Sequence, residues 1–200
     1  MANAAYLSGR RKYALPQAML WSENPGTLSG GFYYPDGYEV GSNLTGVSEN
    51  EKNTFLILSD HNRNELSFGQ ERIQKRERMI NGNMRAYNIA DKINLSTSWQ
   101  MLPSKSYIDN PSFDSNGLTG LRGGAGEFTV DGGAGGLELL GWYENHKGPF
   151  WVYLAYDRYD DKTKYNQIIQ MYFRDFSYSV VKRGFTNHDL WNINITLEEV

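Results

Sequence analysis

The sequence predicts a mainly β protein, a sandwich or barrel of strands with one flanking α-helix and one long β-hairpin. Three observations predict the strands, the helix and the hairpin. Asn81-Gly82-Asn83 separates two extended runs, and Asn-Gly between such runs is a strong hairpin signal because both central positions must accept a positive φ angle. The second run alternates between apolar and polar residues over a long distance. Near the C-terminus, one helical pattern is followed by further alternating or continuously apolar segments.

The second arm of the hairpin has two chemically different faces. Its apolar face, interrupted only by Asp91, carries Tyr87, Ile89, Ile93, Leu95, Thr97, Trp99 and Met101. Its polar face carries Asn88, Ala90, Lys92, Asn94, Ser96, Ser98 and Gln100. A period of two predicts a strand with one buried and one wet face. At roughly 3.3 Å per residue an unbroken strand would reach about 50 Å. A small monomeric sandwich needs less, so we expect part of the hairpin to serve a neighbouring subunit.

We divide the chain into an irregular N-terminal arm or loop region, residues 1–53, and a β domain, residues 54–200. The first region is rich in Tyr, Gly, Pro, Ser and Asn with little periodicity, and a short strand is expected at 31–34. Two alternatives remain open. The region is a surface loop packed on its own domain, or an arm that orders against a neighbouring subunit through aromatic residues such as Tyr33 and Tyr34.

One helix is expected at about residues 135–145. Leu137, Leu140 and Tyr143 or Glu144 have helical spacing there. Asp131 lies upstream, where it could help to cap the start, and Gly148-Pro149 marks the end.

The other strands are expected before the hairpin and after the helix. A short apolar strand at 54–58 opens the domain, and an irregular stretch at 103–136 separates the hairpin from the helix. Three strands close the chain, at 149–156, 168–183 and 189–200. The first is continuously apolar, as expected for a strand covered on both faces. The last alternates, with Trp191, Ile193, Ile195 and Leu197 against Asn192, Asn194, Thr196 and Glu198.

Composition excludes several classes of protein. The net charge of −3 provides no excess of Lys and Arg for clamping DNA. The absence of cysteine excludes disulfides, thiolate metal sites and cysteine nucleophiles. The N-terminus has no apolar secretion signal, and no run approaches the roughly 20 apolar residues of a membrane span. We therefore expect a soluble protein with no membrane partner.

No constellation predicts catalysis, a metal site or a cofactor. The glycine-rich segment Gly117–Gly136 lacks both the Lys-Ser/Thr of a phosphate loop and a GxGxxG unit. His61, His146 and His188 have no HExxH or HxH partner, and no GxSxG motif occurs. The acidic segment DRYDDKTK lacks the glycine of a calcium loop and is interleaved with basic residues.

The densest positive charge lies on the hairpin. It consists of Arg72, Lys75, Arg76, Arg78 and Arg85. Acidic neighbours dilute it, and no RNA-binding aromatic pattern accompanies it. Salt bridges between subunits, or a sheet edge protected by charge, therefore fit better than nucleic-acid contact.

Three segments together resemble tail proteins of long-tailed bacteriophages. They are QERIQKRERMINGNMRAYNIADKINLSTSW with its continuation MLPS, EFTVDGGAGGLELLGWYENHKGPFWVYLAYD, and FRDFSYSVVKRGFTNHDLWNINITLEEV. The likeness covers about residues 54–200 and rests on overall patterning and the closing strand, without a catalytic signature. It implies the tail-tube fold, a small β-sandwich or barrel with a helix on one flank and one long hairpin.

The resemblance implies a non-enzymatic structural subunit of the virion tail, assembled in the host cytoplasm. Its partners would be further copies of itself in stacked rings, hexameric by analogy, and other tail proteins, with double-stranded DNA as transient cargo of the channel. The polar faces of the hairpin and last strand would line that lumen, through Asn88, Asn94, Ser96, Ser98, Gln100, Asn192, Asn194, Thr196 and Glu198. Neutral amides and hydroxyls make weak contacts with DNA phosphates, as sliding requires. The alternative to a channel lining is that the same residues face bulk solvent on the outside of a monomeric sandwich.

Other functions remain open from the sequence. The same fold also serves tail-tip, distal-tail and tail-completion adaptors. A sandwich module would recognise carbohydrate through exposed aromatic residues such as Trp21, Tyr33 and Tyr34. A glycosidase would need two carboxylates, for which Glu127 and Asp131 are available, but proximity in sequence does not establish the separation in space.

Overall fold

The computed structural model describes residues 19–34, 55–60, 62–105, 107–109, 125–129, 133–155, 165–183 and 188–200. Most of its strands form one seven-stranded antiparallel sheet, in the order β4-β1-β9-β10-β11-β6-β5. In this order they are Phe55–Ile57, Met19–Ser22, Phe150–Leu154, Gln167–Arg183, Asp189–Glu199, Met84–Pro103 and Ser67–Arg78. Two small hairpins join β2 (Thr27–Ser29) to β3 (Phe32–Tyr34) and β7 (Tyr107–Asp109) to β8 (Ala125–Glu127).

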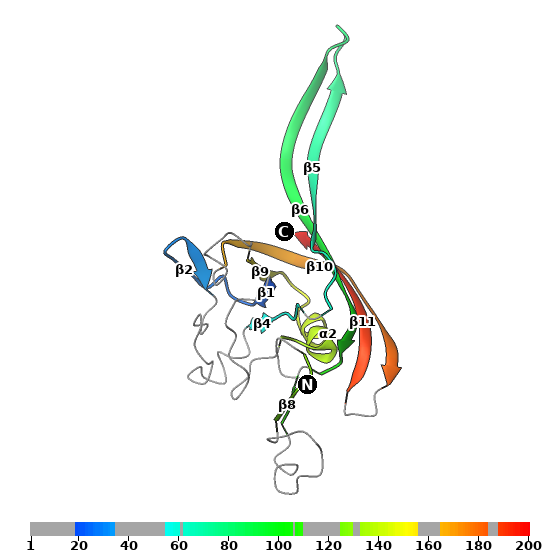
Figure 1. Ribbon diagram of the computed structural model, residues 1–200. Helices are drawn as coiled ribbons and strands as arrows, with labels where there is room; N and C mark the ends of the chain where they lie inside the picture. The colour runs from blue at the N-terminus through cyan, green and yellow to red at the C-terminus, as the bar shows by residue number, and fades with distance from the viewer. Residues whose placement is uncertain are drawn as a thin grey trace, which may run out of the picture.

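The mainly β fold, the long hairpin and the flanking helix are confirmed, but the closed barrel is not. In the described part of the chain, β4 and β5 end the sheet and do not pair with each other. The sheet is open, and the helix α2 (Gly136–Asn145) packs on one of its faces and covers the core there (Figure 1).

The helix packs through a face slightly different from the predicted one. Leu139 and Trp142 are buried, whereas Leu137 and Leu140 are only half-buried. At the N-terminus, the Glu138 carboxylate accepts the N–H of Gly135 at 2.7 Å, and the predicted cap, Asp131, lies outside the described residues. Gly136 allows close approach to the sheet, since a Cβ there would lie 2.7 Å from Cε3 of Trp191.

Strand β1 corrects the prediction of an irregular arm over residues 1–53. All four of its residues are buried, and it lies between β4 and β9. Trp21 packs toward the helix, with ring centroids 6.3 Å from Trp142 and 5.4 Å from Phe150. Leu20 packs on the opposite face with Tyr153 and Tyr165. The expectation that the apolar strand, β9, is covered on both faces is confirmed.

The hairpin turn is longer than the predicted Asn-Gly turn. Met79 and Asn83 close it through the bond from Met79 N to Asn83 O (2.8 Å), and Gly82 N donates to Met79 O (2.9 Å). Gly82 has φ +82°, whereas Asn81 does not have a positive φ. Ile80, Asn81 and Gly82 therefore form a three-residue loop whose last position requires glycine.

Candidate functional site

Four neighbouring strands present a polar face on the side of the sheet opposite α2. Cross-strand partners form rows there: Ser67 pairs with Ser96, Ser96 with Thr196, and Thr196 with Asp175. In the next row Ser98 pairs with Asn194, which pairs with Ser177. We call this surface the polar sheet face; its residues are Ser67, Asn94, Ser96, Ser98, Asp175, Ser177, Ser179, Asn192, Asn194, Thr196 and Glu198.

The alternation that predicted this face is present in the body of the sheet. Leu95, Thr97 and Trp99 are buried on β6, while Ser96 between them is exposed. On β11, Ile193, Ile195 and Leu197 are likewise buried, with Asn194 and Glu198 exposed. The structure thus gathers on one face Asn94, Ser96, Ser98, Asn192, Asn194, Thr196 and Glu198 from the predicted lumen set.

Asn88, also predicted for this face, lies on the other side of the hairpin. Ile73 pairs with Ala90 and Gln74 with Asn88, so Ile89 is an extra residue in β6. Such a bulge reverses the alternation beyond it. Accordingly, Asn88 helps to lower the pKa of Asp91, which lies on the other face of β6 from Asn94.

A second bulge corrects the prediction for Met101. β6 has one more residue than β11 between the pairs Trp99–Ile193 and Leu102–Trp191. Met101 has φ +55° and is exposed, although it was expected on the buried face. Its N–H donates to the side-chain carbonyl of Asn192 at 2.9 Å, so Asn192 stabilises the bulge. Gln100 lies beside the bulge and is exposed.

The polar sheet face contains a depression of about 580 Å³. Its walls are mainly hydroxyls and amides, from Ser67, Ser96, Ser98, Asn194 and Thr196, with Glu65 at one side. Asn64 borders it and is fixed to β6, because its backbone N–H donates to Ser98 O at 2.8 Å and its amide to Ser98 Oγ at 2.7 Å.

Charge on and beside this face does not form a basic stripe. The carboxylates of Asp175 and Glu198 lie on it. Lys92, one pleat beyond Asn94, donates to the backbone carbonyl of Val200. Arg174 lies 4.0 Å from the carboxylate of Glu198. The described surface is therefore neutral to weakly acidic.

The outer part of the β5–β6 hairpin projects from the body of the protein (Figure 1). Three of its predicted inter-subunit cations have partners within the chain. Arg72 binds Asp91 with two bonds, 2.8 and 3.1 Å, and this hydrogen bonding holds the pKa of Asp91 below its usual range. Lys75 lies 2.5 Å from Glu77, and Arg85 lies 5.2 Å from the ring of Tyr87.

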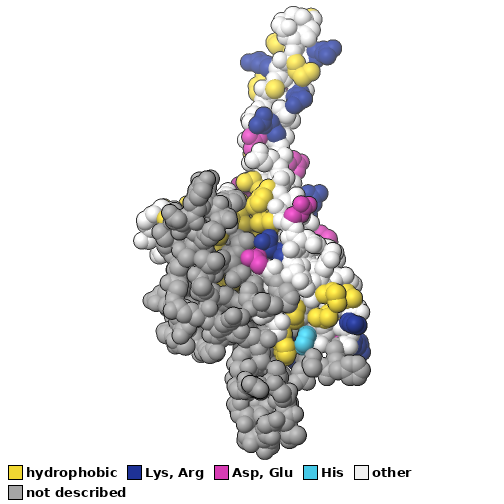
Figure 2. Space-filling model, viewed as in Figure 1, with side chains coloured by type: hydrophobic (Ala, Val, Ile, Leu, Met, Phe, Trp, Pro, Cys, Tyr) yellow, Lys and Arg dark blue, Asp and Glu magenta, His cyan; other side chains and the backbone are white. Residues whose placement is uncertain are grey.

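Arg76 and Arg78 remain available for other partners. Neither has an ion pair or hydrogen bond from its side chain within the described residues. Cationic and apolar side chains are interspersed along the hairpin (Figure 2). On its outer part, the exposed large apolar residues are Ile73, Met79, Ile80, Met84, Tyr87 and Ile89. Such a surface is typical of a region that contacts another molecule.

The aromatic residues predicted for carbohydrate or subunit contact are placed differently. Trp21 is fully buried, so it cannot stack on a sugar. Tyr33 is half-buried on its own chain, where its N–H donates to Tyr165 O at 2.8 Å. The side chains of Tyr34 and Glu127, and all of Asp131, lie outside the described residues.

Two searches of the described residues complete the site. No group of three or more His, Cys, Asp or Glu residues in these segments is arranged to hold a metal ion. No helix among them has both the length and the apolar character needed to cross a membrane. Comparison of the sequence with protein-family models and with curated proteins finds no significant match.

Proposed function

We propose that this chain is a structural, non-enzymatic subunit of a bacteriophage tail tube that assembles into stacked rings around a channel for the genome. The observation that carries the proposal is the polar sheet face, which extends over four strands and is flanked by backbone edges free to pair with further copies. The resemblance of residues 54–200 to phage tail proteins suggests the ring, with six subunits by analogy.

The first edge is the outer side of β5. Among the strands that the structure describes, β5 pairs with β6 alone, and its twelve residues, Ser67–Arg78, lie at the end of the sheet. The second edge is the outer side of β10 beyond Met171. Strand β9 pairs with Gln167 through Met171 and no further, so Tyr172–Arg183 has a partner only in β11 within the described residues.

These two edges flank the polar sheet face and are complementary in direction. Successive strands in the order β10-β11-β6-β5 are antiparallel, so β5 runs opposite to β10. In a cyclic ring every copy has the same orientation along the axis. The β5 edge of one copy then meets the β10 edge of the next in antiparallel pairing, which continues the polar face without interruption and removes both free edges.

The chemistry of the face suits a passage for DNA. A wall of hydroxyls, amides and a few carboxylates stays hydrated and holds phosphates weakly, whereas each free Lys or Arg would add an electrostatic contact and slow sliding. The projecting hairpin, with Arg76, Arg78 and its exposed apolar residues, would make further contacts to neighbouring copies.

Negative-stain electron microscopy over a concentration series tests the assembly. Rings or tubes with an open channel are the expected result. Uniform monomers at every concentration would contradict a self-assembling tube. A tail-tip, distal-tail or tail-completion adaptor of the same fold would then be the stronger interpretation, because such a subunit assembles only on its partner.

Cysteine cross-linking tests which edges meet, and the absence of native cysteine makes the readout clean. Glu71→Cys on β5 is combined with Ser177→Cys or Ser179→Cys on β10, so that two registers are sampled. Oxidation of a double variant should give a ladder of covalent oligomers, while each single variant should give no ladder. The control pair Glu71→Cys with Leu28→Cys places the second thiol on β2, away from either edge. Rings that form normally but cross-link no better than this control would refute the pairing of β5 with β10.

A further inference from the structure

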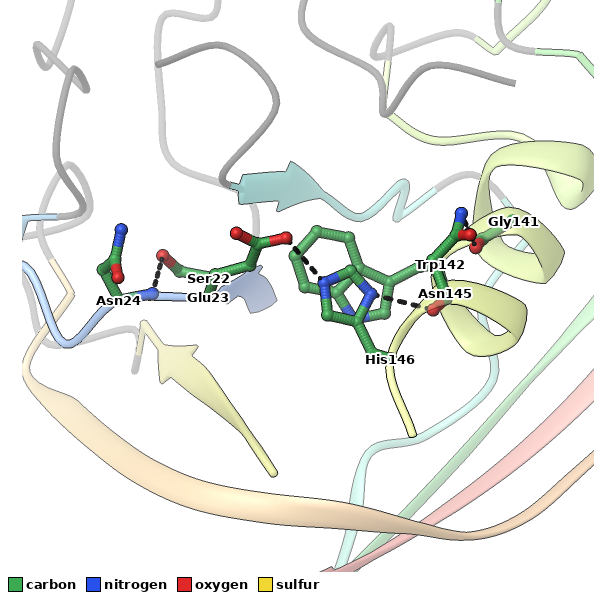
Figure 3. Close-up of polar contacts among 7 residues, drawn as sticks. All are labelled: Ser22, Glu23, Asn24, Gly141, Trp142, Asn145 and His146. Carbon is green, nitrogen blue, oxygen red and sulfur yellow. Dashed lines mark hydrogen bonds and ion pairs between the residues drawn. The ribbon is translucent and has the colours of Figure 1, made fainter. Parts of the chain in front are cut away.

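His146 connects the end of the helix to the chain that follows β1. Its backbone N–H donates to the carbonyl oxygen of Trp142 at 3.0 Å, and its ring nitrogen Nδ1 lies 2.9 Å from the same oxygen. The other ring nitrogen, Nε2, lies 2.9 Å from Oε1 of Glu23. Figure 3 shows the ring between these two groups and over the indole of Trp142, with ring centroids 3.8 Å apart and planes inclined by 16°.

This geometry specifies the protonation state of the imidazole. The carbonyl oxygen of Trp142 can only accept, so Nδ1 must carry a hydrogen. An ionised Glu23 also only accepts, so Nε2 must carry one as well. A neutral imidazole has a single N–H, and both bonds therefore require the imidazolium form. The C-terminal end of a helix and the face of an indole also favour a positive charge.

The other polar groups around His146 do not compete for this role. Nζ of Lys147 lies over the ring of Tyr143, 5.8 Å from its centroid. The side chain of Asn145 donates to Gly141 O at 2.7 Å. From β9, the neighbour of His146 is the apolar ring of Phe150, 6.5 Å away. Among the described side chains, Glu23 is the one whose carboxylate contacts the imidazole.

We propose that His146 and Glu23 form a proton-operated latch between α2 and the segment after β1. Glu23 lies between the buried strand β1 and the hairpin of β2 and β3, in which β2 is exposed. The latch fixes the point at which this hairpin, with the exposed Leu28, leaves the body of the protein. A neutral imidazole can donate to only one of the two acceptors, the Trp142 carbonyl or the Glu23 carboxylate. The latch is therefore closed when the ring carries both protons and opens when it loses one.

The test compares thermal unfolding of the full chain at about pH 5.5 and about pH 8.5, on either side of imidazole titration. Over this interval the wild type should lose about 2–4 °C more in Tm than Glu23→Gln. Glutamine is the matched control because its amide can accept from a charged imidazole or donate to a neutral one, so contact survives at both pH values. His146→Gln should likewise show a reduced pH dependence.

Nitrogen-15 NMR of the wild-type imidazole gives a readout that does not depend on any variant folding. Both ring nitrogens of His146 should be protonated at about pH 5.5, where model imidazoles are mostly charged. An equal pH dependence of Tm in wild type and Glu23→Gln would overturn the latch. A neutral His146 ring at about pH 5.5 would overturn it as well.

Discussion

Replacing Thr97 by valine should stabilise the protein. Thr97 lies on the core face of β6 between Leu95 and Trp99, opposite Ile195, and is 5% exposed. Its hydroxyl oxygen is buried and has no hydrogen-bond partner in the described residues. A buried hydroxyl without a partner costs about 1–3 kcal/mol, and valine replaces it with a methyl group of similar size while keeping the β-branched shape. We expect the free energy of unfolding to rise by about 1–3 kcal/mol.

Urea denaturation followed by fluorescence of the five tryptophans measures this change. The midpoint should rise with an unchanged slope, since the surface exposed on unfolding stays the same. Thr196→Val is the matched control, because Thr196 lies on the polar sheet face, is half-exposed and pairs with Ser96. Its effect should stay within about 0.5 kcal/mol. A Thr97→Val protein that is less stable than the wild type by about 1 kcal/mol or more would show that this hydroxyl is hydrogen-bonded, and would refute the reasoning.

Two further substitutions test how the segments around Ser59 pack. Gly133→Ala should lower the free energy of unfolding in urea by about 1–3 kcal/mol or more, because a Cβ there would lie 2.4 Å from Cα and 2.5 Å from N of Ser59. Gly148→Ala is the control, since a Cβ at this position would have nothing within 4 Å. Equal stability of the two variants would contradict the close approach of Gly133 to Ser59. Trp99→Phe removes the indole N–H that donates to Ser59 O at 2.7 Å. Trp21→Phe is the control, because the equally buried indole N–H of Trp21 has no partner in the described residues. The free energy of unfolding should fall by about 1–3 kcal/mol more in Trp99→Phe than in Trp21→Phe. Equal losses in the two tryptophan variants would indicate that the bond from Trp99 contributes nothing net.

The alternating strands β6 and β11 could be predicted because, in the body of the sheet, one face of each is buried in the core. Strands β6 and β11 alternate where one face packs toward α2 and the other is polar, and a period of two records that asymmetry directly. The helix at 135–145 was found from its spacing and from Gly148-Pro149 beyond it. Its inner face was displaced by about one residue, because the close contact of Gly136 with Trp191 sets the rotation of the helix and involves no apolar side chain on the helix itself.

Strand β1 and the bulges could not be predicted by the same signal. Met19–Ser22 is buried on both faces, so its sequence does not alternate between apolar and polar residues. The segment has four residues and lies in a region rich in Tyr, Gly and Pro, so its apolar run is too short to predict a strand. The bulges at Ile89 and Met101 change the register without changing the composition. On the tip side of Ile89, strict alternation assigns each side chain to the wrong face of the hairpin. For this reason Asn88 was assigned to the face of Asn94.

Within the described residues, the two ends of the hairpin differ in how much of the chain supports them. As far as Ile93, β6 is supported by β11 and by the core, and Glu199 even accepts the N–H of Ile93 at 2.8 Å. Beyond that point β5 is the one described strand that pairs with β6, and Ile89, Met84 and Ile80 are exposed. An isolated two-stranded ribbon is at best marginally stable in water. Its surface combines the cations Arg76 and Arg78 with apolar residues near the tip. This combination is typical of an interface and not of a solvated loop. The same ribbon carries the free β5 edge, so a neighbouring copy that pairs with this edge would also order the hairpin, and assembly and hairpin stability should be coupled.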